Sequence, residues 1–143
     1  MFSTLRTAVA LLLCFSADAC KPPFELRAGF CVYIRRDANL NWYDAYDLCR
    51  SLNGRLAATY ELMKNLGKVG GLSGDPRTWT GINDLQNERG SARDGWQIGK
   101  GSGIFPLDDS VWAVGQPNNA NSGEDCTVVM DSGLVLNDGP CEN

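Results

Sequence analysis

Apolar residues recur with a period of two just after Gly29, where Phe30, Val32 and Ile34 alternate with more polar neighbours. This alternation is typical of a strand with one buried face. Gly29 has no side chain, which suits it to the tight turn that would precede such a strand. The pattern therefore predicts a small hairpin whose second strand begins at Phe30.

The period changes to that of an α-helix in the next segment. Its apolar face follows the i, i+3, i+4, i+7 repeat and carries Trp42, Ala45, Tyr46 and Cys49. Asn39 or Asn41 can serve as the N-cap, and Asn53-Gly54 is a typical helix end. A second, weaker repeat predicts a helix from Tyr60 to Val69, ended by Gly70-Gly71.

The pattern weakens between Gly71 and Gly123, where Gly, Asn, Asp and Ser are frequent and apolar runs are short. We predict long loops here, anchored to the core by Trp96 and Trp112. Loops of this length inside a compact domain are uncommon unless they are functional. Regular structure returns with a predicted hairpin made of strand 126–130, turn 131–133 and strand 134–136.

The chain length of 143 residues is enough for one domain with a hydrophobic core. Lys and Arg number 13 and Asp and Glu number 17, which gives a net charge of −4 at pH 7. A nucleic-acid-binding domain usually carries a basic patch and has a high isoelectric point. We therefore predict no nucleic acid among the partners.

The N-terminal residues have the features of a secretory signal peptide. A short segment with Arg6 precedes an apolar run from Ala8 to Phe15, and Ala17-Asp18-Ala19 has the A-x-A arrangement of a cleavage site. A membrane anchor is the alternative, but the run is about half of the ~20 residues that span a bilayer. We predict a signal peptide over residues 1–19, a mature chain from Cys20, a secreted, extracellular protein and no membrane span.

Cysteine and histidine counts limit the chemistry. Of six cysteines, Cys14 leaves with the predicted signal peptide, and the five that remain are an odd number for an oxidising compartment. The chain has no histidine, which removes Ser/His and Cys/His nucleophilic sites and the usual zinc ligands. A nucleophilic Cys49 is the remaining option, but a thiol on an apolar helix face is expected to be inert. We therefore predict that the protein is not an enzyme.

The stretch 115–126, GQPNNANSGEDC, is rich in side-chain oxygen and has little apolar surface to bury. Calcium takes six to eight oxygen ligands and accepts irregular geometry, and LND at 136–138 adds an amide and a carboxylate. The D-x-[DN]-x-[DN]-G spacing of an EF-hand is absent. The two segments predict a calcium site built from two strands and a long loop, with a metal-free, solvent-facing loop as the alternative.

In their order, these motifs resemble those of a secreted C-type lectin-like domain of the long form, as in invertebrate lectins. The resemblance covers nearly all of the predicted mature chain and rests on Cys20 with Cys31, Trp42-x-x-Ala45-x-x-x-Cys49, WTGIND at 79–84, WAVGQPN at 112–118, EDC at 124–126 and the LND…C segment from 136. It implies an α+β fold in which two helices pack on small antiparallel sheets beside a long calcium-binding loop region.

The resemblance also implies a set of ligands. The family's principal calcium ligands correspond to Gln116, Asn118, Glu124, Asn137 and Asp138, and its sugar-binding residues to the first four of these. In the family, one ion binds two vicinal sugar hydroxyls, and its ligand side chains hydrogen-bond the same hydroxyls. A cis peptide bond before Pro117 is implied as well. A candidate auxiliary calcium site comprises Asp84, Glu88, Asn119 and Asp125, with a solvated acidic loop as the alternative.

Two departures from the family pattern affect these ligands. The triplet here is Gln-Pro-Asn, whereas the family uses Glu-Pro-Asn for mannose-type and Gln-Pro-Asp for galactose-type sugars. Only Glu124 and Asp138 among the five ligands are anionic, one charge fewer than usual, so we expect weaker calcium binding. Leu136 stands where the family has tryptophan, which we interpret as a packing change.

The resemblance implies the disulfides Cys20–Cys31 and Cys126–Cys141. Family members continue to a last strand whose cysteine bonds the helix cysteine, whereas this sequence ends at Asn143. We therefore expect the domain over 20–143 to be C-terminally incomplete and Cys49 to be unpaired. Either the sequence is truncated or the protein lacks that strand, and the loss of such a disulfide typically costs about 2–5 kcal/mol.

These features predict a secreted protein with a calcium site, and the resemblance implies a calcium-dependent lectin that binds mannose-type or galactose-type glycans on microbial surfaces in innate defence. A homo-oligomer is a candidate assembly. The alternative is a secreted lectin-like module that binds a protein or another non-sugar ligand without calcium.

Overall fold

The fold was obtained as a computed structural model that describes residues 10–16, 20–38, 40–70, 72, 78–86, 92–93, 95–100, 103–106, 108–120, 123–130 and 135–142, with only the backbone for 10–16, 36–38 and 130. Its elements are β1 (Ala10–Ser16), β2 (Glu25–Arg27), β3 (Phe30–Ala38), α1 (Trp42–Ser51), β4 (Arg55–Leu56), α2 (Tyr60–Lys64), α3 (Leu66–Val69), β5 (Thr78–Asn83), β6 (Gln97–Ile98), β7 (Cys126–Met130) and β8 (Val135–Gly139).

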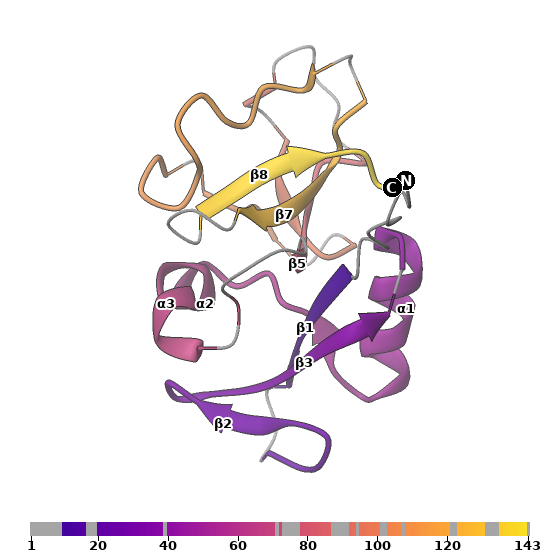
Figure 1. The fold of residues 1–143 in the computed structure, drawn as a ribbon. Helices are drawn as coiled ribbons and strands as arrows, with labels where there is room; N and C mark the ends of the chain where they lie inside the picture. Colours follow the sequence, from indigo (N-terminus) through magenta and orange to yellow (C-terminus); the bar gives the residue numbers. More distant parts are fainter. Residues whose placement is uncertain are drawn as a thin grey trace, which may run out of the picture.

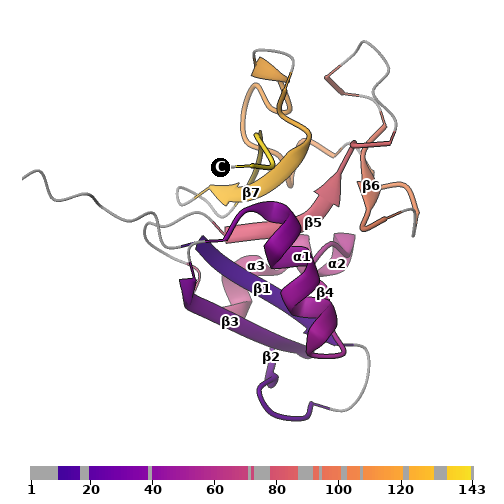
Figure 2. The ribbon, with the colours of Figure 1, turned by 90° about the vertical axis from the view of Figure 1, so that its right-hand side faces the viewer.

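The described strands form one sheet with the order β2-β3-β1-β5-β7-β8, where β4 pairs with β1 and β6 with β5. The small separate antiparallel sheets that were predicted are therefore joined, because β1 pairs antiparallel with β3 and parallel with β5. Figures 1 and 2 show α1 on one side of β1 and the pair α2 and α3 on the other. The long loops gather at the end of the molecule that holds β7 and β8 (Figure 1).

Strand β1 lies inside the segment that the sequence predicts to be a signal peptide. Its backbone pairs with β3 from Ala10 to Ser16, and with β4 and β5 as well. A chain without residues 1–19 would leave a gap between β3 and β5, with unpaired backbone groups along both. Cleavage after Ala19 stays a prediction, and we expect a form that begins at Cys20 to need another strand in that gap.

Two disulfides are as the resemblance implied, Cys20–Cys31 with Cα atoms 5.1 Å apart and Cys126–Cys141 with Cα atoms 5.2 Å apart. The prediction that Cys49 is unpaired is wrong, because Cys49 is disulfide-bonded. That prediction counted only the cysteines after residue 19. Cys49 is fully buried on α1, which keeps its sulfur away from solvent reagents.

Helix α1 forms where the apolar repeat predicted it, and the structure selects Asn41 as the N-cap. The Asn41 side-chain oxygen accepts the backbone N–H of Asp44 at 2.9 Å, which satisfies a donor that the first helical turn leaves open. Trp42 and Ala45 are fully buried. The indole N–H of Trp42 donates to the Thr80 carbonyl at 2.7 Å, which ties α1 to β5.

The prediction of a single helix from Tyr60 to Val69 is wrong about its continuity. The segment is helical, but it forms two short helices that meet at Asn65. The Asn65 side chain donates to the Glu61 carbonyl at 2.7 Å, and its backbone N–H donates to the Leu62 carbonyl at 3.0 Å. Asparagine side chains compete in this way with the regular helical bonding. The described chain thus has three helices where two were expected.

The long loops are anchored as predicted. Trp96 and Trp112 are both 2% exposed, and their ring centroids lie 5.0 Å apart in an edge-to-face arrangement. The ring centroid of Phe105 lies 6.4 Å from that of Trp112, and Phe105 is also buried. The predicted loop region also contains β5, whose six residues are all buried, so the apolar run WTGI is a core strand and not a loop.

Replacement of Gly81 by alanine is expected to destabilise the fold by about 1–3 kcal/mol, the usual cost of overpacking. A Cβ atom at this position would lie 2.5 Å from the backbone oxygen of Leu56 and 3.1 Å from the Cβ of Ala58. Urea unfolding would measure the change. Gly139→Ala is the matched control, because no atom of the described residues lies close to its added Cβ, within 4 Å. Equal stability of the two variants would contradict the close approach at Gly81.

Candidate functional site

The oxygen-rich loop is positioned by a short backbone pairing with β8. Leu136 donates its N–H to the Val111 carbonyl at 2.7 Å, and Ala113 donates to the Leu136 carbonyl at 2.8 Å. Leu136 is fully buried, in agreement with its interpretation as a packing residue. The pairing brings the chain that leads into Gln116 alongside the strand that carries the predicted ligands Asn137 and Asp138.

Asp138, on β8, accepts the hydrogen bonds that order the oxygen-rich loop. It is fully buried, and its carboxylate accepts the backbone N–H of Asn118 at 3.1 Å on each oxygen and that of Asn119 at 2.6 Å. An ionised carboxylate offers about four lone-pair sites. Asp138 therefore orders the loop around it and keeps acceptor capacity for a further partner.

Glu124 forms hydrogen bonds with other residues of the oxygen-rich loop. Its Oε2 accepts the backbone N–H of Ala120 at 3.1 Å, and the same N–H lies 3.2 Å from the Asn118 side-chain oxygen. The Glu124 backbone N–H donates in turn to the Asn119 side-chain oxygen at 3.0 Å. The structure thus gathers Asn118, Glu124 and Asp138 in one hydrogen-bonded cluster.

The remaining two predicted ligands contribute buried oxygens that lack a donor. Gln116 Oε1 and Asn137 Oδ1 are inaccessible to solvent and have no hydrogen-bond partner among the described residues. A buried acceptor left unsatisfied costs about 1–3 kcal/mol, and such groups are rare without an ion or a bound molecule. The donor set fits calcium, which prefers carboxylate and amide oxygens. The peptide bond between Gln116 and Pro117 is cis, as the resemblance implied.

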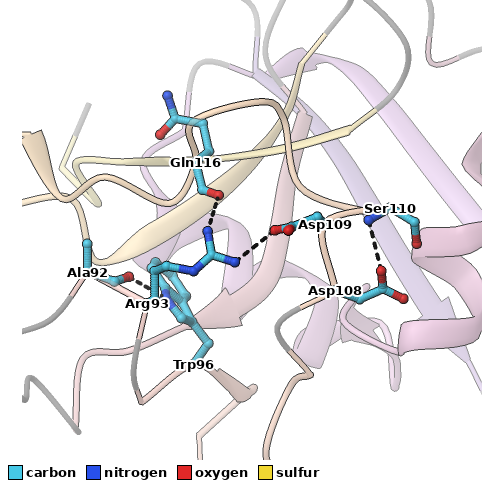
Figure 3. A network of polar contacts seen from close by, with 7 residues as sticks. All are labelled: Ala92, Arg93, Trp96, Asp108, Asp109, Ser110 and Gln116. Carbon is cyan, nitrogen blue, oxygen red and sulfur yellow. Dashed lines mark hydrogen bonds and ion pairs between the residues drawn. The ribbon is translucent and has the colours of Figure 1, made fainter.

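Arg93 supports the loop from outside, a role that the sequence did not reveal. Its guanidinium donates to the Gln116 backbone carbonyl at 3.4 Å and to Asp109 Oδ1 at 2.8 Å. In Figure 3 the Gln116 carbonyl faces Arg93 while its side-chain amide points away. The nearby Trp96 indole donates to the Ala92 carbonyl at 2.9 Å. These contacts join two loops that no local sequence signal connects.

Asp108 joins the segment that leads into the oxygen-rich loop to Tyr60 of α2. The Tyr60 hydroxyl donates to its carboxylate, and the Ser110 backbone N–H donates at 2.8 Å (Figure 3 shows the second bond). These hydrogen bonds, that of Tyr60 first, lower the pKa of Asp108 to about 2. The pKa of Tyr60 is raised, mainly by the same hydrogen bond. The anchor therefore holds over the whole physiological pH range.

The candidate auxiliary calcium site is brought together only in part. Asp84 donates its backbone N–H to the Asp125 carbonyl at 3.0 Å, so these two lie side by side. The Asn119 side-chain oxygen accepts the Glu124 backbone N–H inside the oxygen-rich loop. Glu88 lies outside the described residues. Among residues with described side chains, no three Cys, Asp or Glu groups meet to hold a metal. The auxiliary site stays a prediction.

Comparison with known proteins identifies the family. No protein-family model matches the chain. A solved structure of the cow C-type carbohydrate-recognition domain of CD23, in the presence of GlcNAc2Man3 oligosaccharide, is 30% identical with a TM-score of 0.55, over 73% of each chain. The chain belongs to the C-type lectin-like domain family.

Curated C-type lectins give the same assignment. The chain is 27% identical to C-type lectin domain family 4 member M of Pan troglodytes over 86% of its length, and 29% identical to perlucin-like protein of Mytilus galloprovincialis over 84%. It spans 81% of the second protein but 26% of the first. The α+β C-type lectin-like fold is confirmed, and these relatives are lectins rather than enzymes. No described helix is long and apolar enough to cross a bilayer.

Proposed function

We propose that this C-type lectin-like domain binds carbohydrate through a calcium ion held by Gln116, Asn118, Glu124, Asn137 and Asp138. The observation that carries the proposal is the pair of buried oxygens, Gln116 Oε1 and Asn137 Oδ1, for which the described part of the chain offers no hydrogen-bond donor. They belong to the same loop and strand that Asp138 and Glu124 hold together. A calcium ion would satisfy both oxygens and offset the two carboxylate charges.

The charge of this ligand set predicts a weak site. Glu124 and Asp138 are its only anionic members, and calcium affinity decreases when a site has fewer anionic ligands. We therefore expect a dissociation constant in the range of extracellular modules, about 10⁻⁴–10⁻³ M. Such a site is occupied where calcium is in the millimolar range, which agrees with a secreted protein.

Four of the five ligand side chains would also contact the sugar. Bound calcium would supply two coordination positions for vicinal hydroxyls of a hexose. The amide N–H₂ groups of Gln116, Asn118 and Asn137 can donate to those hydroxyls, and Glu124 can accept from one. Because Gln116 and Asn118 combine halves of the mannose-type and galactose-type triplets, both sugar classes are candidate ligands.

The biological setting follows from the predicted signal peptide and the family. We propose a secreted protein that recognises glycans on microbial surfaces in innate defence. A weak single site would require several copies for firm attachment, because linked sites raise avidity by orders of magnitude. A homo-oligomer is therefore the assembly expected to act.

Affinity resins test the proposed function. The full chain is expected to stay on mannose-, galactose- or GlcNAc-coated resin in millimolar calcium and to leave with a chelator. Failure to bind any of these resins by a protein with a cooperative unfolding transition would contradict carbohydrate binding. A protein partner captured equally with and without calcium would favour the non-sugar module instead.

A further inference from the structure

A cleft apart from the proposed calcium site lies where the end of α1, β4 and the turn after β6 meet. It encloses about 300 Å³ and is lined by side chains that include Tyr46, Arg50, Arg55 and Lys100. None of its lining residues belongs to the proposed calcium site. A volume near 300 Å³ is at the lower end of the range for small-molecule sites, which suits one sugar-sized group.

The cleft concentrates positive charge on a chain whose net charge is −4. Among the residues that the structure describes, its lining holds three cations and no carboxylate. The ion pairs found among the described side chains are Arg27 with Glu25 and Arg93 with Asp109, so none involves a cleft residue. The cations remain exposed at the surface. Three like charges around one small cleft repel one another, and an anion between them would relieve that repulsion.

Tyr46 brings two of these cations together. Lys100 Nζ lies 4.7 Å from the centre of the tyrosine ring, and Arg50 Cζ lies 5.9 Å from it. Both distances are within the range of a cation–π interaction. The half-buried ring therefore holds an ammonium and a guanidinium at the same cleft without neutralising either charge.

The backbone fixes the elements that carry the three cations. Gly81 donates its N–H to the Ala57 carbonyl at 2.7 Å and accepts the Gly99 N–H at 2.9 Å, so it holds the segments of Arg55 and Lys100 on either side of itself. Gly54 donates to the Cys49 carbonyl at 3.0 Å, in the tight turn that joins α1 to β4. The backbone segments that carry the three cations are thus joined by hydrogen bonds.

We propose that this cleft binds a sulfate or phosphate monoester carried by a sugar, independently of calcium. A guanidinium donates two parallel hydrogen bonds to a tetrahedral oxyanion, and an ammonium adds a compact charge. Arg50 and Arg55 supply two guanidinium groups, and Lys100 supplies one ammonium group. The site gives the domain a second contact for glycans that bear anionic substituents.

Isothermal titration in the presence of a chelator tests the proposal, because the calcium site then makes no contribution. The probes are N-acetylglucosamine 6-sulfate, N-acetylglucosamine 6-phosphate and unmodified N-acetylglucosamine. We expect one or both esters to bind and the neutral sugar not to bind. Binding of a single ester supports the proposal and identifies the group.

Arg55→Ala and Lys100→Ala should each weaken ester binding about tenfold, the loss expected when one charge-assisted hydrogen bond is removed. Lys68→Ala is the matched control, since Lys68 is an exposed cation on α3 outside the cleft. Added salt should weaken binding to the unsubstituted chain, because exposed charges are screened. Equal binding of the neutral sugar, no binding of either ester, or full affinity in both cleft variants would overturn the proposal.

Discussion

Glu124→Ala is expected to abolish calcium-dependent sugar retention and to weaken calcium binding about 100-fold or more, since even outer-shell changes at metal sites cost about 10–100-fold. The substitution removes one of two anionic ligands and the acceptor that holds the Ala120 N–H at 3.1 Å. The fold should survive, because the side chain is only half-buried and its loop lies outside the core. Calcium titration by calorimetry and retention on sugar resin would measure the two effects.

Two further variants separate the role of Glu124 from general effects. Glu142→Ala removes an exposed carboxylate outside the proposed ligand set and should leave both measurements unchanged. Glu124→Gln keeps the shape and loses the charge, so it should fall between the unsubstituted chain and Glu124→Ala. Unchanged sugar retention in Glu124→Ala would refute the ligand assignment.

Deletion of residues 1–19 is expected to abolish cooperative unfolding of this 143-residue chain. The deletion removes β1, which pairs with β3 on one edge and with β4 and β5 on the other. Loss of an interior strand exposes two edges and divides the sheet, against a stability of only about 5–15 kcal/mol for a typical domain. Thermal or urea unfolding followed by circular dichroism would measure the change.

Deletion of residues 1–9 is the control, because it leaves β1 in the chain, and it should retain a cooperative transition. A chain that begins at Cys20, ends at Asn143 and still unfolds cooperatively would show that β1 is dispensable. The predicted secreted form would then need no replacement strand between β3 and β5.

The sequence predicted those parts of the fold that local patterns encode. The Trp42, Ala45, Cys49 repeat and the Asn41 cap specify α1 within a single segment, and the alternation around Val32 specifies β3. Asn65 divided the next helix because its side chain bonds to the Glu61 carbonyl, a competition that apolar periodicity does not register. Local patterns therefore predict where helices and strands form more reliably than where a side chain interrupts them.

Strand β1 was not predicted, for a physical reason. The core of a signal peptide and a strand buried on both faces are both continuous apolar runs. The run from Ala8 to Phe15 satisfies either description. The error at Cys49 follows directly, since a cysteine count that begins at residue 20 leaves this thiol over. Hydropathy alone cannot distinguish an exported leader from an interior strand.

The candidate site was predicted from its motif, and its surroundings were not. Gln116, Glu124 and Asp138 follow a recognisable order along the chain, so the sequence identified them as candidate ligands. Arg93 and the cleft cations act across loops and elements that are distant in sequence, such as the contact of Arg93 with the Gln116 carbonyl. Such pairings depend on the tertiary fold and leave no periodic signal.

Calorimetric titration of calcium into the full chain and into Gln116→Glu tests the central claim most directly. The unsubstituted chain should show one saturable site with a dissociation constant of about 10⁻⁴–10⁻³ M. Gln116→Glu adds a third anionic ligand where a buried amide oxygen now lacks a donor, and it should tighten the site by about tenfold. Absence of saturable binding in the unsubstituted chain, together with no gain in Gln116→Glu, would contradict the account.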